Sequence, residues 1–279
     1  LYLKDWHMQR QFPGRFYEAP DFLAAPLHDW LNLHLDTSPE SAEDEDFRFC
    51  YIGAEGTFTP LHHDVMLSYS WSANICGVKR WQLFPPEATP DLLDGRGEPP
   101  PSAAPGRRPS DWASRFPRLD VAWAQRVELV QEPGEIVFVP SGWYHEVENV
   151  TDAVSINHNW FGAASLPRVW DFVESEHRAV RKAIEDIKET FTSIEEWELK
   201  CEELMRTNCG INLTTWMQLL GTAVEEVALS LSDAADGPRR RVASRSLSPL
   251  RVAVGAALQK LESTNLPRAE TAAPAELLF

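Results

Sequence analysis

The sequence predicts a mainly β fold, a sandwich or barrel of short strands, followed by a helical extension. Two observations carry this prediction. From about residue 47 to residue 160, short apolar runs alternate with turns that contain Gly or Pro, as in proteins built from short strands. After Ser165, apolar residues recur at steps of three and four, the period of an amphipathic helix. We therefore divide the 279 residues into a β domain over 1–165, a helical extension over 166–231, and a tail over 232–279 that holds a linker and one short helix.

The β domain contains an apolar run for each expected strand. Gly53 and Pro85 each end such a run, because neither residue suits the interior of a strand. The stretch 94–110 is rich in Pro and Gly, has no core-forming pattern and is interpreted as an insertion. The strands are expected over 47–53, 65–76, 80–84, 135–140 and 153–160, with one more that begins at His145.

The helical extension begins with a long apolar stripe. Two further helices are expected over Ile194–Met205 and Leu213–Leu231, and Asn212 is a candidate N-cap of the second. The segment GPRRRVASRSLSPLR (237–251) holds five Arg and no acid. We interpret it as a solvated linker, with a small anion-binding tail as the alternative, before a short helix over Val252–Leu261. The stripe consists of Val169, Val173, Val180, Ile184, Ile187 and Phe191, and looser helical spacing also occurs upstream, from Asp21 to Leu33.

The composition excludes several classes of protein. Asp and Glu number 42 and Lys and Arg 26, so the formal charge of −16 disfavours a general nucleic-acid binder. No apolar run has the length of roughly 20 residues that a bilayer span needs, and the N-terminus does not resemble a secretory signal. The four Cys are scattered without a CxxC pair, so reduced thiols in a cytoplasmic protein are expected. Because the chain begins at Leu1 without a Met, we expect its upstream end to be missing.

The segment TFTPLHHDVM (57–66) carries the first chemical signal. On a strand, residues i and i+2 share a face, so His62 and Asp64 are expected to point the same way. The third ligand of a metal site must come from elsewhere, and the best candidate is His145, where the chain re-enters a strand after a Ser-Gly turn. Two His and one carboxylate suit a non-haem Fe(II) oxygenase, although the same ligand types also suit zinc.

A cation lies between the two ligand segments. An oxygenase with a dicarboxylate co-substrate needs a positive charge at the far end of its pocket, and Lys79 in GVKRW offers a point charge for it. Thr59 is positioned to donate its hydroxyl to the same carboxylate. Taken alone, Lys79 reads as a solvated turn residue. Its occurrence together with the HxD pair and the later GWYH favours the binding role.

These motifs resemble a known family. TPLHHD, GVKRWQLFPP and EPGEIVFVPSGWYHEV follow one another as in the jumonji-C domain of iron(II)- and 2-oxoglutarate-dependent oxygenases, over residues 51–160. The likeness continues in YLKDWH (2–7), SINHNW (155–160) and CGIN (209–212), and covers roughly residues 1–220. It implies a double-stranded β-helix, which is a jelly-roll, cupin-like barrel, and it implies Fe(II), 2-oxoglutarate and O₂ as cofactor and co-substrates.

The resemblance also implies roles for single residues. The three metal ligands would hold the iron, and Lys79 and Thr59 would bind the C5 carboxylate of 2-oxoglutarate. Tyr2 and Asn157 lie where relatives contact the co-substrate. Members often have an Asn on the strand that leads to the Lys; here that strand offers Ser70, Ser72 and Asn74, and the sequence leaves open which one serves.

The activity that the resemblance implies is hydroxylation of a lysine C–H bond in the eukaryotic translation termination factor, with 2-oxoglutarate converted to succinate. A homodimer through the C-terminal helices is a further expectation, whereas direct contact with nucleic acid or a membrane is not expected. One alternative is demethylation of N-methyl-lysine in histones or other proteins, against which we find no Cys/His zinc finger or histone-reader segment. Another is a catalytically silent cupin-like interaction module, which the intact ligand set disfavours. A zinc isomerase barrel would more typically show an HxH pair and a Glu.

Overall fold

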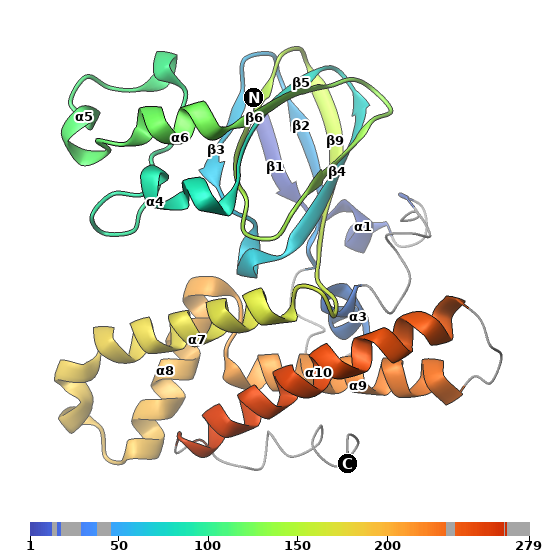
Figure 1. The fold of residues 1–279 in the computed structure, drawn as a ribbon, viewed down its shortest axis with the longest axis vertical. Coiled ribbons are helices and arrows are strands. Elements are labelled where there is room, and N and C mark those ends of the chain that lie inside the picture. The colour runs from blue at the N-terminus through green and yellow to red at the C-terminus, as the bar shows by residue number, and fades with distance from the viewer. Residues whose placement is uncertain (13–15, 18–28, 38–45, 233–237, 265, 267–279) are drawn as a thin grey trace. The chain divides into compact units, whose positions relative to one another are not determined.

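The structure, a computed structural model, describes residues 1–12, 16–17, 29–37, 46–232, 238–264 and 266 (Figure 1). It divides into two compact units, each made of two stretches of the chain. The β unit is Leu1–Tyr17 with Phe47–Asn159, and the helical unit is Glu18–Asp46 with Trp160–Phe279. A single division of the chain at residue 165 leaves Glu18–Asp46 out of the helical unit, to which this stretch contributes the helix α3 (Trp30–Thr37). There His34 Nδ1 lies 2.9 Å from Thr222 Oγ1.

The β unit consists of two sheets with antiparallel strand pairs. From β2 onward the chain alternates between the sheets, except that β5 and β6 are in the same sheet. This alternation defines a double-stranded β-helix, so the predicted mainly β fold is confirmed. The five-stranded sheet has the order β1 (Tyr2–Trp6), β2 (Arg48–Gly53), β9 (Ala153–Trp160), β4 (Tyr69–Cys76) and β7 (Ile136–Val139). The four-stranded sheet has the order β3 (Phe58–His62), β8 (Tyr144–Asn149), β5 (Lys79–Phe84) and β6 (Val127–Gln131).

The period of two separates the faces of these strands. Successive side chains of β5 and β8 point to opposite sides, so alternate residues form the interior between the sheets. Trp81, Leu83 and Val147 pack there with Val137 and Val139 of β7. Short 3₁₀ turns over Val65–Leu67, Pro86–Ala88 and Pro105–Arg107 and a short helix α1 (Met8–Gln11) complete the unit.

The insertion between β5 and β6 contributes to the core of the β unit. It carries α4 (Thr89–Leu92), α5 (Trp112–Arg115) and α6 (Leu119–Gln125) on one side of the β unit (Figure 1). The stretch 94–110 shows no core-forming pattern, yet Ala103 is fully buried in a cluster with Phe84 and Leu92. A single small side chain fills the space beside larger ones, so no periodic pattern is needed.

The helical unit contains α7 (Leu166–Ala183), α8 (Ile194–Cys209), α9 (Leu213–Ser232) and α10 (Pro238–Glu262). The apolar stripe predicted to Phe191 spans two elements, because Ile184 leaves the helical region and the chain continues as a 3₁₀ helix over Glu185–Thr190. The N-cap prediction for Asn212 is confirmed, since its Oδ1 accepts the Thr215 amide at 2.8 Å.

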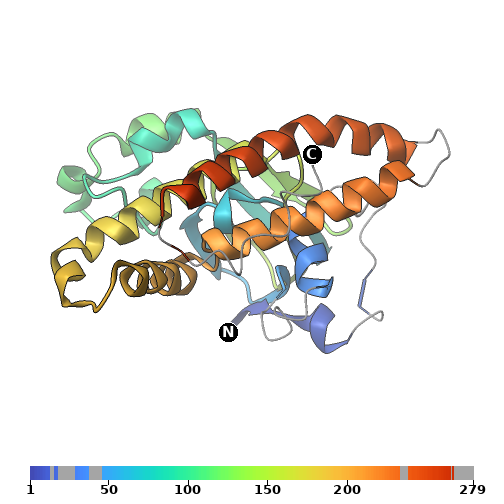
Figure 2. The same ribbon diagram turned by 90° about the horizontal axis from the view of Figure 1, so that it is seen from below.

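The interpretation of 238–251 as a linker is wrong, because α10 begins at Pro238 rather than near Val252. Its buried residues recur at helical spacing and α10 packs against α9, as Figure 2 also shows. Arg240, Arg241, Arg245 and Arg251 are exposed, and the number of arginines masked the apolar stripe in the sequence. The stripe consists of Ala243, Leu250, Ala253, Val254 and Ala257, with the buried Ser246 among them.

All four cysteines are free thiols; Cys50 and Cys201 are buried, whereas Cys76 is exposed. Among the described helices, none combines the length and the apolar composition that a membrane span requires. The part of the expected 21–33 helix before Asp29 lies outside the described residues, as do residues 267–279 of the tail.

Candidate metal centre

The structure brings the three proposed ligands together. His62 is the last residue of β3 and is paired with His145 of β8, and their ring centroids lie 4.2 Å apart. Asp64 follows in extended backbone just beyond the strand. The strand therefore does not itself contain the HxD pair, but the extended backbone keeps the alternation. One donor atom from each residue lies within 4.8 Å of the others.

Backbone carbonyls fix which imidazole nitrogen is free. His62 Nδ1 lies 2.8 Å from Pro60 O, and His145 Nδ1 lies 3.2 Å from Trp143 O. A carbonyl only accepts, so each Nδ1 carries the proton and each Nε2 keeps its lone pair for a metal. Burial and the neighbouring His145 lower the pKa of His62 to about 4, so this ring is neutral at pH 7. The donor set fits a divalent transition metal with open positions.

The loop after Asp64 is strained. Met66 and Leu67 have φ values of 53° and 52°, a left-handed conformation that costs a non-Gly residue about 1 kcal/mol or more. Ser141 Oγ donates to Leu67 O at 2.6 Å, from the turn that leads to His145. The two ligand-bearing segments are thus tied to each other, a feature that no sequence pattern indicated.

The interior also contains a buried cation. Lys79 is 3 % exposed, and its Nζ donates to Ser155 Oγ. No carboxylate of the described residues pairs with it, and burial lowers its pKa to about 8. A buried ammonium without a counter-ion is costly, so the environment of Lys79 fits an anionic ligand better than a solvated turn.

The remaining predicted residues lie in the same interior. Tyr2 and Thr59 hold their hydroxyl oxygens 2.9 Å apart. Asn157 Oδ1 accepts the Ser72 hydroxyl at 2.9 Å and lies 3.5 Å from Ser155 Oγ. Among the three candidates on the strand before the Lys, Ser72 therefore joins the group around Lys79. Ser70 instead donates to Asp64, and Asn74 donates to the Gly77 carbonyl in the turn that follows its own strand.

One further polar residue escaped the sequence analysis. Asn149 is on β8, at the next inward position after Val147 and two inward positions beyond His145, and it pairs with Lys79 on β5. Its Nδ2 donates to Thr57 Oγ1 at 2.9 Å, while its buried Oδ1 has no partner among the described residues. A Cβ at Gly53 would come within 2.1 Å of this Nδ2, so only glycine leaves it room. The alternation of β8 from His145 was the available signal.

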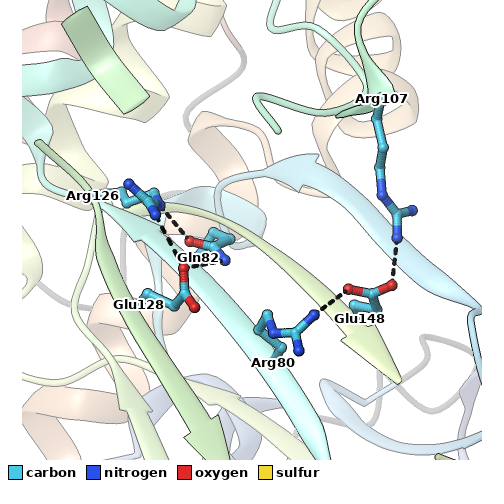
Figure 3. A network of polar contacts seen from close by, with 6 residues as sticks. All are labelled: Arg80, Gln82, Arg107, Arg126, Glu128 and Glu148. Atoms are coloured by element: carbon cyan, nitrogen blue, oxygen red, sulfur yellow. Dashed lines mark hydrogen bonds and ion pairs between the residues drawn. The ribbon is translucent and has the colours of Figure 1, made fainter. Parts of the chain in front are cut away.

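A hollow of about 380 Å³ lies on the other face of the same sheet, between β5, β6, β8 and the insertion. Figure 3 shows that Arg80, Arg107, Glu128 and Glu148, which line this hollow, all make polar contacts, with Gln82 and Arg126 as further partners. Glu148 accepts from Arg80 and Arg107, at 3.1 and 2.8 Å. Glu128 accepts from Gln82 at 3.0 Å and from Arg126 at 3.1 Å. This network ties the insertion to the sheet.

A double-stranded β-helix with two imidazoles and a carboxylate at one place in its interior defines a cupin-like metal-binding barrel. Sequence comparison gives the same class, because the model of the cupin-like domain matches residues 19–164, and the chain belongs to this family. The resemblance to the jumonji-C oxygenases is confirmed by three relatives among the curated proteins.

The 2-oxoglutarate and iron-dependent oxygenase JMJD4 of Danio rerio is 41% identical over 224 residues, which cover 80% of this chain and 50% of that protein. JMJD4 of Homo sapiens is 38% identical over 239 residues, which cover 84% of this chain and 54% of that protein. The arginine-specific demethylase JMJ20 of Arabidopsis thaliana is 37% identical over 238 residues, which cover 76% of this chain and 46% of that protein. The chain thus spans about half the length of these relatives.

Proposed function

We propose that the protein is an iron(II)- and 2-oxoglutarate-dependent oxygenase that hydroxylates a protein side chain. The observation that carries the proposal is that one β-helix interior contains both a His-Asp-His set and the buried Lys79, whose charge no carboxylate of the described residues neutralises. 2-Oxoglutarate has a keto-acid end that chelates metal and a second carboxylate that needs a cation. The two features match its two ends.

The chain's own residues bind and orient in this mechanism. Nε2 of His62 and of His145 and the Asp64 carboxylate would hold Fe(II), and Lys79 with Thr59, Tyr2 and Asn157 would hold the co-substrate. Bound iron supplies the oxidising chemistry, in which O₂ and 2-oxoglutarate become succinate and CO₂ while a substrate C–H bond becomes C–OH. The protein contributes position and a dry interior, and no further acid or base among the named residues is required.

For the substrate we propose a lysine of the eukaryotic translation termination factor, and for the location of the reaction the cytoplasm. The likeness to the JMJD4 oxygenases supports this choice, and the charge of −16 suits a basic, lysine-bearing segment. Demethylation is the second candidate, because the Arabidopsis relative is named an arginine-specific demethylase. The silent-module alternative is disfavoured by the intact ligand and Lys79 geometry.

Mass spectrometry of candidate substrates after incubation with Fe(II), ascorbate and 2-oxoglutarate separates these functions. Gain of one oxygen atom on a lysine supports the hydroxylase, and loss of a methyl group from a methylated peptide supports the demethylase. Succinate formation without either change would contradict both substrates. Incubation without 2-oxoglutarate is the control.

A homodimer through the C-terminal helices is also proposed. Most apolar residues of α9 are already buried within the helical unit, but Leu229 and Val252 are 60 % and 68 % exposed on α9 and α10. Light scattering at micromolar concentration should give twice the mass of the chain. A monomeric mass would remove the proposal.

A further inference from the structure

The carboxylate of Asp64 is held on both oxygens. Ser70 Oγ donates to Oδ2 at 2.7 Å, and Asn159 Nδ2 donates to Oδ1 at 2.8 Å. Ser70 is on β4 and Asn159 is on β9, so two different strands fix one side chain. Asn159 also donates to Ser68 Oγ at 3.1 Å, which anchors its own amide. Asp64, Ser70 and Asn159 are 9 %, 3 % and 5 % exposed.

Both donors are neutral, and this matters for the chemistry. A Lys or Arg at either position would compensate the negative charge and compete with a metal, whereas a hydroxyl and an amide orient the carboxylate and leave its charge in place. Each carboxylate oxygen has a second lone-pair direction, so accepting one hydrogen bond does not prevent ligation. The clamp thus fixes the plane of the carboxylate before any metal arrives.

The loop that carries Asp64 needs such support. Two left-handed residues, Met66 and Leu67, lie within three positions after it, and such strained backbone persists only where surrounding contacts hold it. His62 and His145 are aligned by strand pairing, but Asp64 lies beyond the end of β3. Its position therefore depends on side-chain contacts rather than on the sheet.

We propose that Ser70 and Asn159 are positioning residues that set the metal affinity of the site by holding the Asp64 carboxylate in its ligating orientation. The inference rests on the proposed function, since it takes His62, Asp64 and His145 as the ligands. It assigns no contact of either residue with the metal.

The strand β4 offers a matched control. Ser72 is the next inward-facing residue after Ser70 and is equally buried, but its hydroxyl donates to Asn157 and not to Asp64. Ser72→Ala therefore removes the same group from the same strand without touching the clamp. Ser70→Thr keeps a hydroxyl, and Asn159→Leu keeps the shape of the side chain without its donors.

The test is titration of the metal-free protein with Co(II), followed by the visible absorption of the bound ion. Loss of a group that orients a ligand typically lowers metal affinity about 10- to 100-fold, so we expect losses of this order for Ser70→Ala and Asn159→Leu. Ser70→Thr and Ser72→Ala should bind Co(II) like the wild type. The 2-oxoglutarate requirement at saturating metal should be nearly unchanged in Ser70→Ala, because the clamp acts on the metal and not on the far carboxylate.

Asp64→Ala separates this inference from the proposed function. If that variant binds Co(II) like the wild type, the ligand assignment fails and both proposals fall. If Asp64→Ala loses Co(II) while Ser70→Ala and Asn159→Leu keep it, only the inference is overturned. An equal loss in Ser72→Ala would also overturn it, as general damage to the strand. Should Ser70→Ala fail to fold by circular dichroism, Ser70→Cys keeps the size with a weak S–H donor and must show the same loss.

Discussion

The two faces of β5 and β8 treat charge in opposite ways. On the outer face, Arg80 and Arg107 share the carboxylate of Glu148, and these side chains are partly exposed. On the inner face, and among the described residues, Lys79 is buried without a counter-ion and Asp64 accepts only from neutral groups. The consecutive residues Lys79 and Arg80 of one strand therefore differ in how their charge is compensated. A paired surface charge holds structure together, while an uncompensated buried charge indicates where a ligand of opposite sign belongs.

The largest effect is expected from the inner carboxylate. Asp64→Ala should abolish iron-dependent turnover of 2-oxoglutarate while the fold stays intact, because the metal loses its only anionic ligand among the three. Succinate formation measures the loss, and circular dichroism checks the fold. Unchanged turnover would contradict the interpretation of the inner face, because Asp64 would then not be a ligand of the metal.

The next effect concerns the inner cation. Lys79→Met should raise the 2-oxoglutarate concentration needed for half-maximal turnover by about 10-fold or more, because a charge-assisted contact is lost. If the requirement stays the same, Lys79 binds no co-substrate carboxylate.

The same variant should be more stable than the wild type without ligand. Burial lowers the pKa of Lys79 from 10.5 to about 8, so below pH 8 both folded and unfolded chains carry the proton and the full cost of burying the charge is present. Removing it should add roughly 1–3 kcal/mol to the free energy of unfolding at pH 7. Above about pH 10.5 both states are neutral and the gain should vanish, which urea unfolding at the two pH values measures. A constant gain would mean that packing, not charge, is responsible.

His177 in the helical unit is a second buried titratable group, and it is neutral at pH 7. Neither of its ring nitrogens has a hydrogen-bond partner within the described part of the chain. Burial, with Lys260 of α10 and Arg181 of α7 nearby, lowers its pKa from 6.5 to about 4. Between these values the unfolded chain binds more protons, so stability falls as the pH drops. His177→Leu should therefore stabilise the protein more at pH 5 than at pH 7.5, by about 1–2 kcal/mol in thermal unfolding. An equal gain at both pH values would contradict this origin.

The smallest effect is expected on the outer face. Glu148→Gln removes the charge that Arg80 and Arg107 share, and partly exposed pairs contribute about 0.2–1 kcal/mol each. Stability should fall by about 1 kcal/mol in low salt and less in high salt, while Co(II) affinity and the 2-oxoglutarate requirement stay unchanged. A change in either binding property would show that the two faces are not independent.

Sequence reasoning located most of the candidate site for a clear reason. Ligand types, their spacing in HxD and the intervening Lys are local features, and alternation along a strand gives the facing direction. The strand predicted over 153–160 coincides with β9, and the N-cap at Asn212 was readable because its hydrogen bond is local. Each of these needs only neighbours in the chain.

The rest depended on contacts between distant segments. Ser70 and Asn159 meet Asp64 only because β4 and β9 are neighbours in one sheet, and Asn149 comes beside Lys79 only through the register of β8 with β5. The strained turn at Met66 and the burial of Ala103 likewise require the folded surroundings. The sequence by itself thus determined the fold class and the chemical type of the centre. Only the tertiary structure decided which neutral groups hold its charges, because hydrogen bonds across sheets join residues whose separation along the chain carries no pattern.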